Sequence, residues 1–299
     1  MVKQPWLDRS SCDRLLSRAQ RVGCGGGDVP LAIVTGASRG LGAAYARQLA
    51  ARGWDLVLVA RDQLRLEEVA SDLTGQHRTQ VMTRVLDLSM PDAAHGLYAA
   101  ARERGAAVDL LVNNAGFGLY GDFVDLPMAR IQAMLRVHVN TVVESMRLFL
   151  PGMIERRAGG IINVASLAGF FAVPYMAEYA ATKAFLITFS QAVAEEVRPF
   201  GVRIQACCPG KTLTDFHATA GEETRNVLGT RTAEEVARQS LAALERGPVV
   251  LAVGWQEKTV SRLTRLVPRG VLARFTARWM RKHRTEISGQ GELRQRRRG

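Results

Sequence analysis

Tyr179 and Lys183 stand four positions apart in a stretch with helical periodicity, which places both side chains on one face, a turn apart. A tyrosine titrates near pH ~10, too high for a group that exchanges protons at neutral pH. An ammonium one turn away favours the phenolate and lowers that pKa. The pair therefore predicts acid–base chemistry, with Tyr179 as proton donor or acceptor and Lys183 as the group that adjusts its pKa.

A glycine-rich turn near the start of the chain predicts an anion-binding site. The segment 35–42 reads Thr-Gly-Ala-Ser-Arg-Gly-Leu-Gly, follows an apolar run and opens a helix-period stretch. Glycines let the backbone approach a diphosphate closely, and the exposed N–H groups of a helix N-terminus bind its charge. The spacing Gly-x3-Gly-x-Gly differs from the commoner dinucleotide fingerprint, and an ordinary tight turn is the alternative.

These groups need a scaffold, and the rest of the sequence alternates short apolar runs with longer helix-period stretches. This alternation predicts one Rossmann-type, doubly wound α/β domain over residues 30–256, with helices on both faces of a parallel sheet. The expected strands are 31–35, 54–60, 81–86, 110–113, 160–164, 203–207 and 249–253. The expected helices are 41–52, 63–73, 93–104, 128–150, 178–198 and 233–245.

Further motifs follow these runs in a fixed order: Asp87-Leu88, Asn113-Asn114-Ala115-Gly116, Asn140, Ser166, Tyr179-x3-Lys183 and Pro209-Gly210. With the glycine turn, they resemble the short-chain dehydrogenase/reductase family over roughly residues 30–255. The resemblance implies a nicotinamide-dependent oxidoreductase whose catalytic residues are Asn140, Ser166, Tyr179 and Lys183. It implies that Ser166 binds the carbonyl oxygen, that Asn140 anchors a water of a proton relay, and that Lys183 also holds the nicotinamide ribose.

The resemblance also implies the set of cofactor-binding residues. These are Gly36, Ser38, Arg39, Gly40, Leu41, Gly42, Arg61, Asp87, Leu88, Asn114, Ala115, Gly116, Tyr179, Lys183, Pro209, Gly210, Thr212 and Thr214. Ala60 stands where members that prefer NAD carry an aspartate, and Arg39 and Arg61 suit a ribose 2′-phosphate. We therefore expect NADP(H). NAD(H) is the lesser alternative, because Asp62 could turn inward to a ribose hydroxyl.

The segments after the later strands carry apolar and aromatic residues, which favour an apolar, lipid-like ketone as the substrate. The expected substrate-contacting residues are Phe117, Phe171, Tyr175 and Phe216. The sequences that flank these motifs resemble those of bacterial oxidoreductases related to long-chain 3-oxoacyl and hydroxysteroid reductases. His138 and His217 have no implied partner and are not expected to act, and no metal site is expected.

The net charge of +12 belongs to the ends of the chain. Residues 257–299 hold 13 Lys and Arg against 3 Asp and Glu, whereas residues 30–256 hold 22 of each. Residues 257–285 predict a basic amphipathic helical extension that packs on the domain or a partner subunit, lies on a membrane surface, or, least favoured, binds nucleic acid. Residues 1–29 and 286–299 are expected to be a flexible extension and a disordered basic tail.

Four cysteines without paired spacing fit a reducing cytoplasm, and neither a signal peptide nor a transmembrane span is predicted. We expect a cytoplasmic homo-oligomer, with membrane association left open through the extension. The sequence thus predicts an NADPH-dependent reductase of an apolar ketone. The alternative is an NADP(H)-binding sensor whose basic C-terminus docks on a membrane or nucleic acid.

Overall fold

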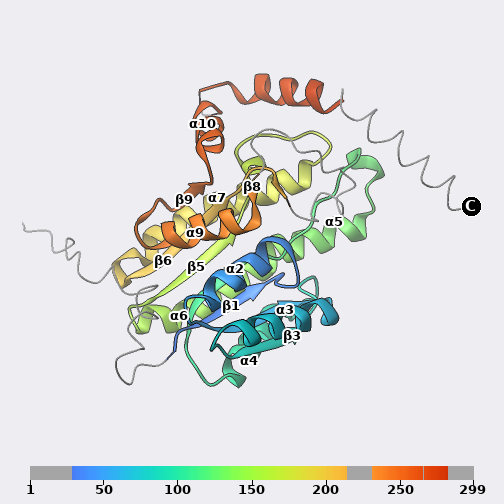
Figure 1. Ribbon diagram of the computed structural model, residues 1–299. Coiled ribbons are helices and arrows are strands. Elements are labelled where there is room, and N and C mark those ends of the chain that lie inside the picture. Colours follow the sequence, from blue (N-terminus) through green and yellow to red (C-terminus); the bar gives the residue numbers. More distant parts are fainter. Residues whose placement is uncertain (1–28, 214–230, 265, 282–299) are drawn as a thin grey trace, which may run out of the picture.

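A computed structural model describes residues 29–213, 231–264 and 266–281, which are built around a seven-stranded parallel sheet (Figure 1). The strands are β1 (Leu31–Thr35), β2 (Asp55–Ala60), β3 (Val81–Val85), β4 (Val108–Asn113), β5 (Gly159–Val164), β6 (Val202–Cys208) and β9 (Val250–Ala252). Their order is β3-β2-β1-β4-β5-β6-β9. The chain therefore winds outward in both directions from β1 and β4. A parallel sheet of this kind binds ligands at the carboxyl ends of the strands beside that switch point.

Helices cover both faces of the sheet, because alternate strand residues point to opposite sides and nearly all are apolar. Ile33 packs in one buried cluster with α4 (Ala93–Glu103), α6 (Thr141–Glu155) and α7 (Ala177–Val197). Its neighbours in β1 pack in a second cluster with α2 (Gly40–Ala50), α3 (Gln63–Gln76) and α9 (Ala233–Arg246). The doubly wound α/β fold predicted from the sequence is confirmed.

The helix expected over residues 128–150 is interrupted. It consists of α5 (Met128–Leu135), a π-helical segment (Arg136–Asn140) and α6. A π turn contains more residues than an α turn, so the positions that follow it are rotated relative to a continuous α-helix. Residues from Arg136 onward therefore lie on different faces from those that a continuous helix over 128–150 would give them.

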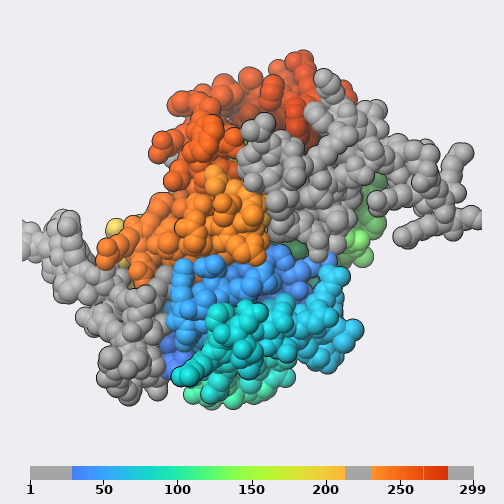
Figure 2. Space-filling model, viewed as in Figure 1, coloured from blue at the N-terminus to red at the C-terminus, as the bar shows by residue number. Residues whose placement is uncertain are grey.

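The C-terminal extension is helical but not continuous. α10 (Trp255–Leu263) follows β9, and a second helix covers residues 269–281 after Pro268. Figures 1 and 2 show these helices, in orange and red, at one end of the molecule. Glu257 of α10 is buried beside Gly210 and pairs with Arg231, which ties the start of the extension to the segment after β6. Within the described residues, no helix is both long enough and apolar enough to span a membrane.

Candidate active site

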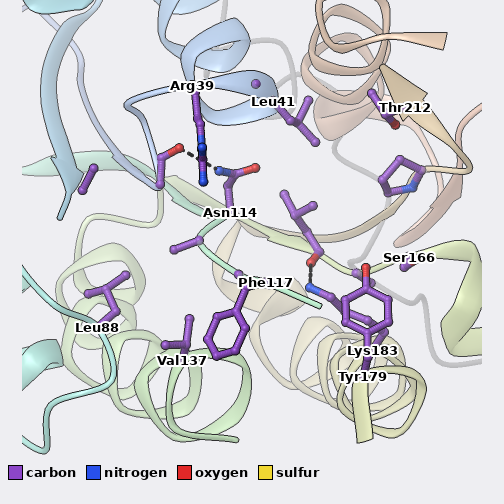
Figure 3. Close-up of a pocket in the computed structure, with 18 of the residues that line it drawn as sticks. Arg39, Leu41, Leu88, Asn114, Phe117, Val137, Ser166, Tyr179, Lys183 and Thr212 are labelled. Atoms are coloured by element: carbon purple, nitrogen blue, oxygen red, sulfur yellow. Dashed lines mark hydrogen bonds between the residues drawn. The ribbon is translucent and has the colours of Figure 1, made fainter. Parts of the chain in front are cut away.

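A cavity of about 1110 Å³ lies at the carboxyl ends of the central strands. Its lining includes most of the residues predicted to bind a cofactor: Gly36, Ser38, Arg39, Gly40, Leu41, Arg61, Asp87, Leu88, Asn114, Ala115, Gly116, Tyr179, Lys183, Pro209, Gly210 and Thr212. Figure 3 shows Arg39 and Leu41 toward one end and Ser166, Tyr179 and Lys183 gathered at the other. Motifs that are far apart in the sequence therefore meet in one continuous site.

The glycine turn forms one wall of the cavity. Gly36 has a φ of +66°, a left-handed conformation that favours glycine. Gly42 lies behind it, where a Cβ would overlap the carbonyl oxygen of Gly36. The α2 N-terminus begins at Gly40 and has no side-chain cap and no acidic residue in its first turn. Its N–H groups and the positive end of the helix dipole therefore suit an anionic group.

The segment after β4 is held against this turn through Thr35. The backbone N–H groups of Asn114 and Ala115 both donate to the Thr35 hydroxyl, at 2.9 and 3.0 Å. The Asn114 side chain donates to the carbonyl oxygen of Thr35 at 2.8 Å. A Cβ on Gly36 would lie 2.9 Å from the Cα of Ala115, so the two segments touch. Two motifs some 80 residues apart thus form one rigid wall.

One end of the cavity is basic. Arg39, Arg61 and Arg65 all line it. Asp62 also lines it, but its carboxylate caps α3 by accepting a hydrogen bond from the Arg65 N–H at 3.2 Å, and it pairs with the Arg65 side chain at 3.4 Å. Burial would raise the pKa of Asp87, but hydrogen bonds from Ser89 and the charge of Arg61 lower it overall. This end therefore suits a ligand with negative charge.

Ser166, Tyr179 and Lys183 cluster at the opposite end of the cavity. Tyr179 and Lys183 are 8% and 4% exposed, so little water reaches them. The Lys183 ammonium donates to the Val164 carbonyl oxygen at 2.8 Å and lies 5.6 Å from the centroid of the Tyr179 ring. Ser166 shares a hydrogen bond with Tyr179 and caps the short 3-10 helix Leu167–Phe170. A hydroxyl, a phenol and an ammonium thus converge where a carbonyl oxygen could be bound.

The pKa of Tyr179 shifts in the opposite direction to the sequence prediction. Burial raises it to about 12, and the hydrogen bond with Ser166 offsets only part of that effect. Burial likewise lowers the pKa of Lys183 to about 8. The prediction assumed that the ammonium dominates, but burial is the first cause of the pKa shift of both groups, and the Lys183 charge is not among the causes for Tyr179. At neutral pH Tyr179 keeps its proton and can donate it.

Asn140 does not join this cluster. It is exposed, at the end of the π-helical segment, and lies outside the residues that line the cavity. Ala133 of α5 and Val137 of the π-helical segment line the cavity instead, and the wider π turn changes the face on which Asn140 falls relative to a continuous α-helix. The relay role implied for Asn140 has no support in this arrangement. His138, which the sequence offered no reason to select, is instead buried against Tyr179.

The residues predicted to contact the substrate differ in whether they line the cavity. Phe117 lines the cavity, and Met176 does so although it was not in the predicted set. Phe171 and Tyr175 are half-buried but lie outside its lining. Thr214, Phe216 and His217 lie outside the described residues.

Comparison with known proteins identifies the family. The short chain dehydrogenase family matches residues 30–225, which is more than half of the chain. The chain belongs to the short-chain dehydrogenase family. Proteins of this family are oxidoreductases that bind a nicotinamide cofactor.

The relatives found by sequence include named reductases and an uncharacterised oxidoreductase. The chain is 36% identical over 182 residues to the very-long-chain 3-oxoacyl-CoA reductase of Bos taurus, covering 60% of this chain and 58% of that protein. It is 31% identical to an uncharacterised oxidoreductase of Staphylococcus saprophyticus, covering 72% of this chain and 91% of that one. The chain thus spans only about three fifths of the length of the mammalian reductase.

Solved structures of the family superimpose well on this chain. A short-chain dehydrogenase from Sphingobium yanoikuyae in complex with NADPH has a TM-score of 0.70 at 30% identity, covering 80% of this chain and 95% of that one. A bulky-bulky ketone specific alcohol dehydrogenase from Comamonas testosteroni has a TM-score of 0.67 at 29% identity, with 80% and 94% covered.

Proposed function

We propose that this protein is an NADPH-dependent reductase that converts an apolar ketone to the alcohol. The observation that carries the proposal is the single cavity with a basic end at Arg39 and Arg61 and a proton-donating end at Tyr179. The α2 N-terminus, which follows Arg39 directly and has no side-chain cap, lines the cavity at Gly40 and Leu41 and suits a diphosphate. A nicotinamide dinucleotide is long enough to reach from the basic end to Tyr179, and its phosphates carry the negative charge that the basic end and the α2 N-terminus suit.

In the proposed reaction the bound cofactor supplies the hydride. Ser166 donates a hydrogen bond to the substrate carbonyl oxygen and holds it near the phenol. Tyr179, protonated at neutral pH because burial raises its pKa to about 12, gives its proton to the oxygen as the alkoxide forms. Lys183 keeps a positive charge beside the phenol and stabilises the phenolate that remains.

An apolar substrate is favoured by the surroundings of Tyr179. The tyrosine packs in a buried cluster with Leu119, Ile131 and Met134. Phe117 and Met176 pack against that cluster and line the cavity. The names of the relatives, a very-long-chain 3-oxoacyl-CoA reductase and a bulky ketone dehydrogenase, point in the same direction. We infer a lipid-like carbonyl compound, such as a long 3-oxoacyl thioester or a steroid ketone.

The function is tested by mixing the purified chain with NADPH and a panel of 3-oxoacyl thioesters, steroid ketones and small polar carbonyl compounds. Loss of absorbance of the reduced nicotinamide should occur with the apolar members and rise with acyl length. Faster turnover of the small polar compounds would contradict the substrate assignment. Binding of NADPH without turnover of any carbonyl compound would instead favour the alternative of a cofactor-binding sensor.

The cofactor assignment predicts a selective loss when Arg39 and Arg61 are both replaced by alanine. Each charge-assisted hydrogen bond to a phosphate is worth about 1.5–3 kcal/mol, so NADPH affinity should fall about 100-fold or more. NADH lacks the 2′-phosphate and should lose little affinity. Asp62 is engaged at the start of α3, which leaves it poorly placed for a ribose hydroxyl. Equal losses for the two cofactors would refute the assignment.

The second helix of the extension favours a location at a membrane surface. Val271, Phe275 and Trp279 form a stripe at intervals of four residues and are 55%, 66% and 53% exposed. The opposite stripe is half-buried, and there the Thr276 hydroxyl lies 3.0 Å from the Ala172 carbonyl oxygen and equally 3.0 Å from the carbonyl oxygens of Leu272 and Ala273 in its own helix. Packing on its own domain, one of the options from the sequence, thus leaves the aromatic stripe exposed.

Arginines alternate with this stripe, which points to an anionic lipid surface as its partner. Arg274, Arg278 and Arg281 are exposed next to the aromatic positions. The core of a protein–protein interface is depleted in charge, whereas interfacial membrane helices combine Trp and Phe with flanking Lys and Arg. Ala172 lies in the segment between Ser166 and Tyr179, so a lipid surface bound here would adjoin the substrate side of the site.

Charge reversal on this helix should weaken its binding to anionic vesicles. Each basic residue contributes about 1 kcal/mol at an anionic membrane, so the double change Arg274→Glu and Arg278→Glu should weaken binding to phosphatidylcholine–phosphatidylglycerol vesicles about 30-fold or more. Sedimentation with these vesicles measures it. The matched control, Arg102→Glu with Arg238→Glu, reverses two exposed charges on α4 and α9 and should bind as wild type. Equal sedimentation of both variants, or dissociation of a dimer by the first one alone, would overturn the lipid assignment.

A further inference from the structure

His138 is a buried histidine whose two ring nitrogens are both engaged. It lies in the π-helical segment and is 1% exposed. Its Nε2 accepts a hydrogen bond from the Phe117 backbone N–H at 3.1 Å. Its Nδ1 lies 2.9 Å from the Thr182 hydroxyl. Because Nε2 is an acceptor, the proton of the neutral ring is on Nδ1, which donates to Thr182.

The two partners of His138 belong to the two halves of the proposed active site. Phe117 ends the segment 114–117, which lines the cavity and packs on the glycine turn. Thr182 lies in α7 directly before Lys183, and its hydroxyl donates to the Tyr179 carbonyl oxygen at 2.8 Å. One imidazole thus connects the cofactor side of the cavity to the helix that carries the proton donor.

The ring also fills the space between these elements. It meets the Phe117 ring edge-on with centroids 6.0 Å apart and the Tyr179 ring edge-on at 5.9 Å. A Cβ on Gly116 would come within 2.6 Å of Nε2, so the chain at Gly116 lies directly on the imidazole. Burial, together with the nearby Lys183 charge, holds the pKa of His138 well below its usual value, so the ring stays neutral.

We propose that His138 is a positioning residue, which sets the distance between the segment Asn114–Phe117 and the pair Tyr179 and Lys183. This inference rests on the proposed function of the cavity and adds a residue that neither the motifs nor the resemblance assigned to it. Sub-ångström placement of reacting groups matters, because a shift of about 1 Å can cost ~100-fold in rate. His138 touches only protein groups, so it acts through its neighbours.

Two conservative variants separate its two hydrogen bonds. In His138→Gln, the side-chain oxygen replaces Nε2 as the acceptor for the Phe117 N–H, and the bond to Thr182 is lost. In His138→Asn, the side-chain amide replaces the Nδ1–H donor to Thr182, and the bond from Phe117 is lost. A residue with a merely structural role would lose stability in both variants without separating cofactor binding from turnover.

The expected results differ between the variants. His138→Asn should raise KM for NADPH roughly tenfold at nearly constant kcat, and His138→Gln should lower kcat roughly tenfold at nearly constant KM. Amide hydrogen exchange in residues 114–118 of the unliganded protein should accelerate in His138→Asn alone, a readout that needs no activity. Ser240→Ala is the control: Ser240 is fully buried, bonded to Gln205 and outside the cavity, so thermal stability should fall with kcat and KM unchanged.

The proposal is overturned if the two variants change kcat and KM in parallel, or if exchange in residues 114–118 is the same in both. An inactive wild-type protein would refute the proposed reductase. Exchange confined to His138→Asn would still show in that case that His138 holds the segment.

Discussion

Replacing Tyr179 by phenylalanine is expected to lower kcat/KM for carbonyl reduction by about 10²–10⁴, the usual contribution of a positioned general acid. The ring remains, so its packing against Leu119 and Met134 and its contact with His138 should persist. Affinity for NADPH and the melting temperature should therefore change little. Steady-state kinetics, cofactor titration and thermal unfolding of the same preparation measure the three quantities.

Tyr98→Phe is the matched control. Tyr98 lies in α4, where its ring packs edge-on against Phe149 at 5.3 Å, and it does not line the cavity. Removing its hydroxyl should leave turnover at the wild-type level. If Tyr179→Phe also retains wild-type turnover, Tyr179 is not the proton donor and the mechanism is wrong.

The fold could be predicted from the sequence because its determinants are local. Runs such as residues 56–60 are apolar at every position, as a strand covered on both faces requires. The glycine turn lies within a few residues of the end of β1, and Tyr179 and Lys183 lie four residues apart on one helix. Their local geometry therefore follows from their spacing in the sequence. Their meeting follows from parallel topology, because the carboxyl ends of neighbouring strands lie at one edge.

Other features of the candidate site could not be predicted, because they depend on tertiary packing that the spacing of residues in the sequence does not encode. The sequence predicts one continuous helix over 128–150, but the structure has a π-helical segment in which Val137 lines the cavity, His138 is buried and Asn140 is exposed. The pKa of Tyr179 could not be predicted either, since it is raised mainly by burial, which depends on the tertiary structure. No spacing signal could have selected His138, because α5 separates it from Gly116 in the sequence and only the structure shows that Gly116 leaves room for the ring by lacking a side chain.

The second large effect concerns Lys183, whose activity and stability should change in opposite directions. Burial lowers its pKa to about 8, so the ammonium is charged at neutral pH and loses its proton as the pH rises through that value. If the charge stabilises the Tyr179 phenolate, the reduction rate of the wild-type enzyme should fall above about pH 8. Lys183→Met should lower kcat roughly 100-fold at pH 7 and show no such decline.

The free energy of unfolding of the wild-type protein should rise over the pH range in which its reduction rate falls. The pKa of Lys183 drops from 10.5 in the unfolded chain to about 8 in the folded protein, so the folded state binds fewer protons between these values. Its free energy of unfolding therefore rises with pH across that window, and below it the buried charge costs on the order of 3 kcal/mol. Lys183→Met removes that cost, and its melting temperature at pH 7 should equal or exceed that of the wild type. A variant that lost both activity and stability would show instead that the bond to Val164 holds the strand end in place. The kinetic loss would then reflect a distorted site and not a missing charge.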